Sequence, residues 1–487
     1  LSTVISGESP ESPGAKKMKR LLKPFTFLAR KTAFSLGRFL TRTRRVGPAA
    51  LFLESQIRPL RGAGPPQADE GFNLLLLPKP GFTEDALSSF GGRPDFSLYT
   101  FDRGLIKAMA GAFPSLVLDD NKYLSNDPQV EREKSDLRDF WRRVFTAYLK
   151  RRRLDAVLTG SYWYAAEQEL AGALSEIGVP FIALHKECLK TPGLETFYGE
   201  VYRTRKNKFQ GTKILVYNEM ERNIQIAAGV APPADILVTG MPRLDRLHEL
   251  RRRSGPGPDG PQKDNGPAPP TVLFFLFHHK SGLPVVGSKE VKGFEALEAQ
   301  LERLNLARMA DSAHQALLDL ARGHPEMRLI LKTKGDAIAK RTLDHYFGGQ
   351  GPLPDNLETH NGGDLFPLIK RSAVAVGFNT TALFEALAAG LRVIVPNYYE
   401  ALSPDLKPYL LDFGDAVHYA DSPGQLQEMM LRFARPQEAE GETAAKQAAL
   451  DNLMDQWLGN PDGRAGERVR EAVIGIIQEH RPVRERR

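Results

Sequence analysis

Short apolar runs alternate with helical stretches along most of this 487-residue chain, and this alternation limits its fold more than any other feature. Each run is apolar on both sides, as a strand must be when helices cover both faces of a sheet. The alternation predicts a parallel, doubly wound sheet. In the first half we expect strands at 74–77, 116–118, 155–159, 180–184, 213–217 and 236–239, and helices at 130–151, 165–177 and 220–228.

Residues 254–270 interrupt this pattern, because ten of these seventeen residues are Gly or Pro. Such a segment is typical of a linker or a long surface loop. Beyond it the alternation resumes, with strands expected at 272–277, 328–332, 373–378 and 392–396 and helices at 293–322 and 381–389. We therefore expect an N-terminal α/β domain at 71–250, a linker at 251–270, a C-terminal α/β domain at 271–435 and C-terminal helices at 436–487.

The charge of the chain is concentrated in one segment. The net charge is +7, but residues 16–45 hold eleven basic residues and no acidic ones. The rest of the chain has 55 basic and 59 acidic residues and carries −4. This distribution describes a slightly acidic protein with a basic arm, not a basic surface made for nucleic acid.

Residues 16–45, here called the basic arm, have apolar residues at helical spacing from Met18 to Leu40. Their opposite face carries Lys23, Arg30, Lys31, Arg38 and Arg42. A helix of this kind can bury its apolar face in a membrane interface while its cations meet anionic headgroups. It can equally pack on its own domain or serve another partner. We expect a disordered tail at 1–15, and irregular chain from the end of the arm to residue 71.

Several reaction classes lack their sequence signals. Cys188 is the single cysteine, so no intrachain disulfide can form, and a single thiol fits the cytosol. No stretch of 18 apolar residues predicts a transmembrane helix, and the N-terminus does not look like a secretory signal. There is no Cys/His set at zinc spacing, no Walker loop, no Gly-x-Gly-x-x-Gly and no Gly-x-Ser-x-Gly elbow. We expect neither a metal nor a cofactor.

Residues 373–396 carry the clearest site signal. A buried strand runs into a turn with Gly377 and Asn379, and Thr380 or Thr381 then supplies a helix N-cap. The free N–H groups of a first helical turn bind anions, and ligands of open α/β sheets bind at the carboxyl ends of strands. Glu385 lies one turn deeper, where a carboxylate can accept hydrogen bonds from a ribose diol. The purely structural alternative is a capped, solvated helix that ends at a C′ glycine.

This segment resembles the donor-nucleotide loop and helix of GT-B glycosyltransferases and related enzymes. Those include UDP-N-acetylglucosamine 2-epimerases, CDP-glycerol glycerophosphotransferases and bacterial capsule or surface-carbohydrate biosynthesis proteins. The matching residues are Glu385-Ala386, Ala389-Gly390 and Pro396. Two further motifs are similar to motifs of the capsule-type and glycerophosphotransferase proteins: Thr239-Gly240-Met241-Pro242-Arg243-Leu244-Asp245, and Leu184-His185-Lys186-Glu187 with Thr191-Pro192-Gly193. The resemblance covers residues 155–396 and implies a GT-B fold of two domains that face a cleft.

Residue roles follow from strand-end position and from the resemblance. His185 follows an expected strand and suits a general base for an acceptor hydroxyl, with Glu187 or Asp245 orienting or replacing it. Donor binding is expected from His279, Lys280, Lys332, Lys334, Asn379, Thr380, Thr381 and Glu385, and acceptor-side contacts from Gly240 and Arg243. His360 and Asp364 belong to a turn that could pack on the base. For each of these residues, the alternative is a purely structural role without ligand contact.

Two departures from the resembling families narrow the function. Asn379-Thr380-Thr381 replaces the Ser-Gly-Gly typical of the epimerases, and Lys186-Glu187 replaces the Gly-Thr-Pro typical of the glycerophosphotransferases. We therefore expect a metal-independent glycosyltransferase that uses a nucleotide-sugar donor and a lipid-linked or polysaccharide acceptor. It would work in the cytoplasm, at the inner face of the cell membrane. An epimerase, a glycerophosphate or polyol-phosphate transferase, and a non-catalytic nucleotide-sugar-binding scaffold remain the alternatives.

Overall fold

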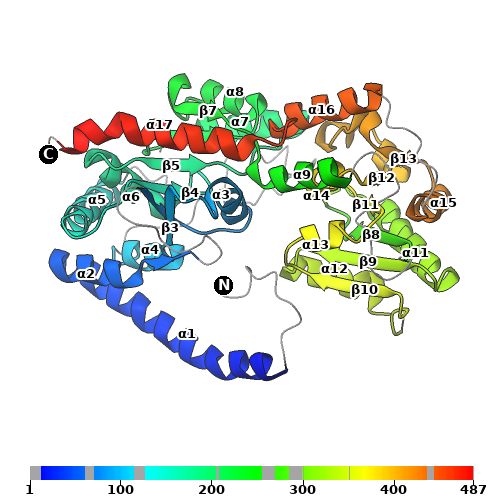
Figure 1. Ribbon diagram of the computed structural model, residues 1–487, viewed down its shortest axis with the longest axis horizontal. Coiled ribbons are helices and arrows are strands. Elements are labelled where there is room, and N and C mark those ends of the chain that lie inside the picture. The colour runs from blue at the N-terminus through cyan, green and yellow to red at the C-terminus, as the bar shows by residue number, and fades with distance from the viewer. Residues whose placement is uncertain are drawn as a thin grey trace. The chain divides into compact units, whose positions relative to one another are not determined.

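The chain forms two compact units, each built around one sheet (Figure 1). The computed structural model describes residues 13–60, 71–113, 127–204, 208–254, 269–283, 299, 301–349, 351–435 and 444–485. Unit 1 comprises the described residues of Leu189–Phe197 and Leu244–Gly463, and unit 2 those of Ser6–Cys188, Tyr198–Arg243 and Arg464–Arg487. The division therefore falls between Arg243 and Leu244 and not at the expected residue 250. The end of the chain, from Arg464, returns to unit 2.

Unit 2 has a seven-stranded sheet in the order β1-β3-β2-β4-β5-β6-β7. All neighbouring strands are parallel except β1, which pairs with β3 in the antiparallel sense. The strands are β1 Arg58–Pro59, β2 Phe72–Leu76, β3 Phe96–Thr100, β4 Ala156–Thr159, β5 Phe181–Leu184, β6 Lys213–Val216 and β7 Ile236–Val238. Its helices are α1 Pro13–Arg42, α2 Val46–Gln56, α3 Phe82–Phe90, α4 Arg103–Ala110, α5 Pro128–Leu149, α6 Ala165–Glu176, α8 Glu219–Ala227 and α17 Ala465–Glu485.

Alternate residues of each strand point to opposite faces of this sheet. Both faces carry apolar side chains, and helices cover both. Leu75 and Val157 belong to a core cluster with residues of α1, α2, α4, α5 and α6. Leu74, Leu76 and Leu158 belong to a second cluster with residues of α3 and α17. The apolar runs of β4 and β5 and the run at 74–77 are therefore buried on both sides, as predicted.

Unit 1 has a six-stranded, fully parallel sheet in the order β10-β9-β8-β11-β12-β13. Numbered along the chain, this order is 3-2-1-4-5-6, the order of dinucleotide-binding sheets. The strands are β8 Thr271–Phe275, β9 Arg328–Thr333, β10 Leu357–Asn361, β11 Val374–Val376, β12 Arg392–Pro396 and β13 His418–Ala420. Its helices are α9 Asp245–Ser254, α11 Ala307–Gly323, α12 Ala337–Phe347, α13 Phe366–Ile369, α14 Ala382–Ala388, α15 Pro423–Ala434 and α16 Ala444–Leu458. Helix α7, Pro192–Thr204, crosses the division between the units.

The predicted fold class, two doubly wound parallel-sheet α/β units, is confirmed. Three expectations need correction. The stretch after the arm is not irregular, because α2 forms there and buries Ala49, Ala50 and Leu53. The expected tail at 1–15 overlaps the start of α1, and the expected linker overlaps the end of α9, whose last residue is Ser254. Residues 1–12, 116–118 and 255–268 lie outside the described residues.

Strands β3, β10 and β13 and helices α3, α4, α12 and α15 were not anticipated from the sequence. Two of these strands, β10 and β13, form the edges of the unit 1 sheet. Within the described ranges, no helix combines the length and apolar character needed to cross a lipid bilayer.

Candidate functional site

The carboxyl edge of the unit 1 sheet has a topological switch point. The chain passes from β8 outward to β9 and β10, then returns to β11 on the other side of β8. Ligands of open α/β sheets bind beside such a point, between the two loops that leave in opposite directions. The loops concerned follow β8, at 276–283, and β11, at 377–381.

The loop after β11 has a conformation that its residues require. A Cβ at Gly377 would lie 3.1 Å from Phe275 Cδ2 and 3.2 Å from Leu383 Cδ2, so the core leaves little room for a side chain. Asn379 has φ 48°, a left-handed conformation that asparagine tolerates better than most residues. Its Nδ2 donates to the carbonyl oxygen of Tyr409 at 3.0 Å, and its Oδ1 accepts from the Leu411 N–H at 2.9 Å. Its side chain thus holds the turn to a neighbouring loop.

Three successive backbone N–H groups of this turn, those of Asn379, Thr380 and Thr381, donate no hydrogen bond to another described residue. Successive free N–H groups around a left-handed residue form a concavity that binds anions. Thr380 Oγ1 accepts a long bond, 3.4 Å, from the Ala382 N–H, and the Thr381 side chain makes no capping bond. The turn therefore has the geometry of an anion site, and phosphate binding at residues 379–381 stays a prediction.

Helix α14 ends as its sequence requires. Gly390 has φ 83°, its N–H donates to the carbonyl oxygen of Leu387, and the Leu391 N–H donates to that of Ala386. This is the paired bonding of a Schellman motif, and the predicted C′ glycine is confirmed.

Lys332 and Glu385 lie within electrostatic range of each other at the carboxyl edge of this sheet. Burial lowers the pKa of the half-buried Lys332 ammonium, while the carboxylates of Glu385 and Asp364 oppose that shift. Lys332 Nζ donates to the carbonyl oxygen of Thr333 at 2.7 Å. The structure thus brings together two residues, 53 positions apart in the chain, that the sequence assigned to the donor.

Arg246 pairs with Asp364 and is a residue of this edge that the sequence did not indicate. Arg246 Nη2 donates to Asp364 Oδ1 at 2.6 Å and its Nη1 donates to Oδ2 at 3.2 Å, a bidentate pair. The Arg246 guanidinium also lies 4.9 Å from the centre of the Phe366 ring. Arg246 directly follows the motif that ends at Asp245, so extending that motif by one residue would have included it.

The loop after β8 contributes less to an open site than expected. Lys280 Nζ donates to the backbone carbonyl oxygens of Leu301, Glu302 and Leu304, so its ammonium is already engaged by these carbonyl groups. His279 is exposed, and its carbonyl oxygen accepts from the Leu306 N–H at 2.8 Å.

His278 lies in this loop, within electrostatic range of Lys334 at the same edge. Burial lowers the pKa of its imidazole, and the nearby charges of His279 and Lys334 lower it further. Lys334 lies one residue beyond the end of β9 and is exposed. His360 also lies at this edge of the sheet, on β10, with its Nε2 3.3 Å from Glu358 Oε2.

The carboxyl edge of the unit 2 sheet holds the other predicted residues. His185 follows β5 and its side chain has no exposed surface. Its Nε2 lies 3.2 Å from Glu221 Oε1, and its ring lies 5.0 Å from that of Tyr162. Glu221 in turn accepts from Tyr202 Oη at 3.0 Å and from Gln225 Nε2 at 2.8 Å. His185 is therefore part of a buried polar network, and in this conformation an acceptor hydroxyl has no access to it.

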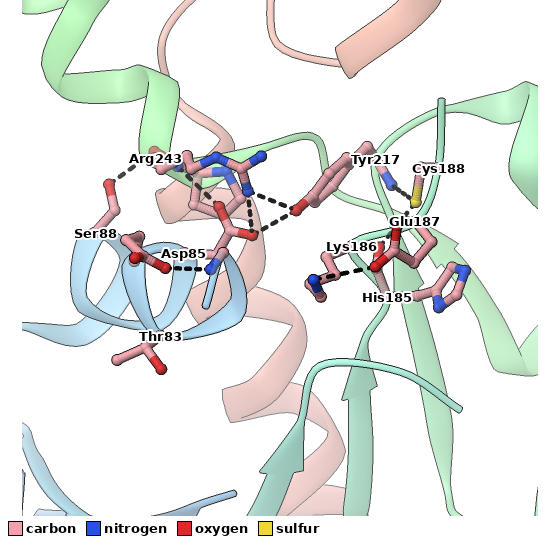
Figure 2. Close-up of polar contacts among 12 residues, drawn as sticks. Thr83, Asp85, Ser88, His185, Lys186, Glu187, Cys188, Tyr217 and Arg243 are labelled. Carbon is pink, nitrogen blue, oxygen red and sulfur yellow. Dashed lines mark hydrogen bonds and ion pairs between the residues drawn. The ribbon is translucent and has the colours of Figure 1, made fainter. Parts of the chain in front are cut away.

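Glu187 has the accessibility that His185 lacks. Its side chain is half exposed, and its Oε1 lies 3.0 Å from Lys186 Nζ (Figure 2). The side chain of the next residue, Cys188, is buried instead. Its Sγ donates to the carbonyl oxygen of His185 at 2.8 Å and accepts from the Tyr217 N–H at 3.3 Å. Of the two predicted bases at this strand end, Glu187 is the one that faces solvent.

Arg243 is engaged by unit 2 itself. Its Nη1 donates to Asp85 Oδ2 and to Tyr217 Oη, both at 3.0 Å, and its backbone N–H donates to Asp85 Oδ1 at 3.2 Å (Figure 2). Asp85 is buried on α3, and burial with the Asp85 charge raises the pKa of Tyr217 well above its usual value. Gly240, with φ 84°, makes the turn that leads to Arg243.

Asp245 belongs to unit 1 and not to the unit of His185 and Glu187. Its Oδ1 accepts from Asn460 Nδ2 at 2.8 Å, at the start of α9. The motif Thr239–Asp245 is therefore divided, with Arg243 ending a segment of unit 2 and Asp245 lying in unit 1. Among the described residues, no group of three His, Cys, Asp or Glu side chains is placed to hold a metal ion.

Solved structures with a similar arrangement are sugar-nucleotide epimerases and a teichoic acid enzyme, and both kinds are GT-B proteins. UDP-GlcNAc 2-epimerase from Neisseria meningitidis, bound to UDP-GlcNAc, is 11% identical, with a TM-score of 0.41, and the match covers 83% of this chain and 100% of that one. UDP-GlcNAc 2-epimerase from Methanocaldococcus jannaschii is 11% identical, with a TM-score of 0.42 and coverage of 83% and 99%. The wall teichoic acid polymerase TagF is 10% identical, with a TM-score of 0.44 and coverage of 97% and 100%.

At these identities, and at TM-scores below 0.5, the likeness does not establish a function for this chain. No protein-family model matches the chain. No curated protein matches it in sequence.

Proposed function

We propose that this protein is a glycosyltransferase that moves a sugar from a nucleotide-activated donor to a surface-polysaccharide acceptor, without an essential metal ion. The observation that carries the proposal is the carboxyl edge of unit 1. There, a turn with three free N–H groups lies on a sheet of dinucleotide-binding order, and Glu385 follows on the next helix.

Each part of a nucleotide diphosphate finds a matching group at this edge. The N–H groups of residues 379–381 would bind a phosphate, and Lys332 and Lys334 would add positive charge as the nucleotide leaves. Glu385 would accept hydrogen bonds from the ribose hydroxyls. The Arg246–Asp364 pair and the Phe366 ring would border the base. Because protein groups supply the positive charge, the leaving diphosphate would need no bound cation.

Unit 2 would supply the acceptor side. Glu187 is an exposed carboxylate at a strand end and is the better placed base for an acceptor hydroxyl. His185 would act at most indirectly, through its buried network with Glu221. Gly240 and Arg243 would shape this edge of the sheet through Asp85.

The basic arm supports a site of action at a membrane. Its eleven cations without an acidic residue suit the anionic inner face of a cell membrane, and the single cysteine suits the cytoplasm. The acceptor would then be lipid-linked. The structures of similar fold that carry names of sugar-nucleotide and teichoic acid enzymes agree with this class of substrate.

Nucleotide binding is the first test. The melting temperature is measured with CMP, CDP, UDP, GDP and ADP for the wild type, Glu385→Gln and Glu326→Gln. Glu326 is an exposed control that precedes β9, at the amino edge of the same sheet. A ligand at 100 times its Kd adds about 2.7 kcal/mol of stability. We expect one nucleotide to stabilise the wild type and the Glu326 variant, and Glu385→Gln to lose most of that shift. If no nucleotide stabilises the wild type, the donor site is refuted.

The product then decides the reaction. With the sugar nucleotide of the matching base, a transferred sugar supports the proposal. An epimerised sugar nucleotide indicates the epimerase alternative, and a transferred phosphodiester indicates the glycerophosphate or polyol-phosphate transferase. Binding without turnover on any acceptor tested supports the non-catalytic scaffold.

A further inference from the structure

Helix α1 is docked on unit 2 through one of its faces. Arg30 Nε pairs with Asp102 Oδ2 at 2.9 Å, and Arg38 Nη2 donates to the carbonyl oxygen of Gly111 at 2.7 Å. A Cβ on Gly37 would lie 2.8 Å from Leu105 Cδ1, so the helix approaches α4 closely at this point. Leu40 is buried on the same side. These contacts fix which face of α1 turns away from the protein.

Away from this contact, α1 exposes large apolar side chains over a wide arc. Leu28 and Phe39, here called the outward row, are 63% and 52% exposed. Phe27 and Leu36 are 62% and 43% exposed, and because they are nine residues apart they lie on opposite flanks of the helix, about 180° from each other. At about 100° per residue, Leu28 and Phe39 are only about 20° apart around the helix axis. Leu28 lies about 180° from Gly37, which marks the docked face. The outward row is therefore a consequence of how α1 docks.

Exposed large apolar side chains are concentrated on this helix. Single exposed apolar residues are ordinary, whereas a concentration of them on one element points to an interaction site. Nine large apolar side chains are exposed in the part of the chain that the structure describes, and four of them lie within these 13 residues. The sequence had assigned one continuous apolar stripe to this helix. The structure divides that stripe, with Leu40 turned inward and Leu28 and Phe39 turned outward.

Cations run alongside the outward row. Lys31 and Arg42 are exposed, and the same eleven-residue spacing places them on a second line about 60° from that of Leu28 and Phe39. Lys31 Nζ lies 4.6 Å from the centre of the Phe27 ring. Long cationic side chains beside apolar ones can keep their charges at headgroup level while their stems enter the apolar layer.

We propose that the outward face of α1, with Leu28 and Phe39 flanked by Lys31 and Arg42, inserts into the interface of an anionic lipid bilayer while its inner face stays docked on α4. A second copy of this chain fits less well, because a symmetric contact would bring these cations against their own counterparts. The proposal supplies the lipid partner of the proposed function, but it does not depend on nucleotide chemistry.

The test is co-sedimentation of the full chain with phosphatidylcholine vesicles, with and without phosphatidylglycerol. We expect binding to the anionic vesicles and little to the neutral ones. Leu28→Glu with Phe39→Glu should lower the partition coefficient by more than about tenfold. Lys31→Gln with Arg42→Gln should lower it about 25-fold on anionic vesicles alone, since each cation contributes about fivefold. Leu402→Glu is the matched control, because Leu402 is a 56% exposed leucine of unit 1.

Three results would overturn the proposal. The first is absent binding, or equal binding to both vesicle types, by the wild type. The second is unchanged binding by the Leu28/Phe39 variant, and the third is a wild-type dimer that this variant dissociates. Circular dichroism and the melting temperature confirm that each variant is folded. The nucleotide-induced melting shift reports on unit 1 separately, so a failed donor site and a failed lipid site give different results.

Discussion

Replacement of Asn379 separates two roles that the sequence could not distinguish. The sequence assigned this residue to donor binding, whereas its amide in the structure is engaged by Tyr409 and Leu411. A third, longer contact joins Nδ2 to the carbonyl oxygen of Ser281 at 3.4 Å. We expect Asn379 to position the turn, with its backbone N–H and not its side chain facing the ligand.

The expected loss of stability follows from these contacts. Two good hydrogen bonds at about 1 kcal/mol each give a loss of about 2 kcal/mol for any side chain that cannot form them. Alanine adds about 1 kcal/mol, because φ 48° is unfavourable for it. Glycine adopts this φ freely and avoids the added cost. We therefore expect Asn379→Ala to lose about 3 kcal/mol and Asn379→Gly about 2 kcal/mol.

The assay measures urea unfolding and nucleotide affinity for the wild type and both variants. If Asn379 positions the turn, both variants lose stability in the absence of nucleotide, and both bind nucleotide more weakly because the N–H groups are no longer held. If stability is unchanged while binding is lost, Asn379 contacts the ligand through its side chain and the positioning argument is refuted. Equal stability for alanine and glycine would refute the backbone part of the argument.

Four further measurements test other parts of the structure. Gly377→Ala should destabilise unit 1 by about 1–3 kcal/mol in urea, because its Cβ would press on Phe275 and Leu383; unchanged stability would contradict the packing. Burial lowers the pKa of His314 from 6.5 to about 4, so the folded state binds fewer protons than the unfolded state between these values. Stability should fall by about 3 kcal/mol as the pH drops through this window, and His314→Gln should flatten that dependence. Glu187→Gln should lower kcat for sugar transfer about 100-fold or more with little change in nucleotide affinity, and a normal kcat would remove its role as base. Removal of divalent cations with a chelator should leave turnover unchanged, whereas a loss restored by added metal would refute metal independence.

The interior strands could be predicted because their sequences carry the physical constraint directly. A strand with helices on both faces must be apolar on both sides, and β2, β4, β5 and β12 show this over four or five residues. The two edge strands of unit 1 lack the signal, and β3, an interior strand of unit 2, was also missed. In β10, Glu358 and His360 are only partly buried, and β13 has three residues. The order of the strands also follows from non-local pairing, which no local pattern specifies.

The turn after β11 could be predicted for a similar reason. Gly377 and Gly390 bracket a short helix, and each has a packing or backbone requirement that few other residues meet. Arg246 and Asp364 could not be paired in advance, because they are 118 positions apart and neither belongs to a periodic pattern. Lys280 shows the converse. Its position after a strand suggested a ligand contact, but a flexible ammonium takes the nearest carbonyl oxygens, and these are contributed by residues 301–304.

His185 shows why position at a strand end does not determine accessibility. In an extended chain, side chains alternate between two sides, so His185 and Glu187, two residues apart, would lie on the same side. The chain leaves the sheet between them, however, and only the Glu187 side chain reaches solvent. What decides the difference is a set of partners from other elements: Glu221 on α8, Tyr202 on α7 and Tyr162 after β4 enclose the imidazole. A buried imidazole beside a carboxylate contributes to stability and to the shape of the loop that follows it. Under the proposed function, the base at this strand end is therefore the side chain that the loop presents to solvent, which is Glu187.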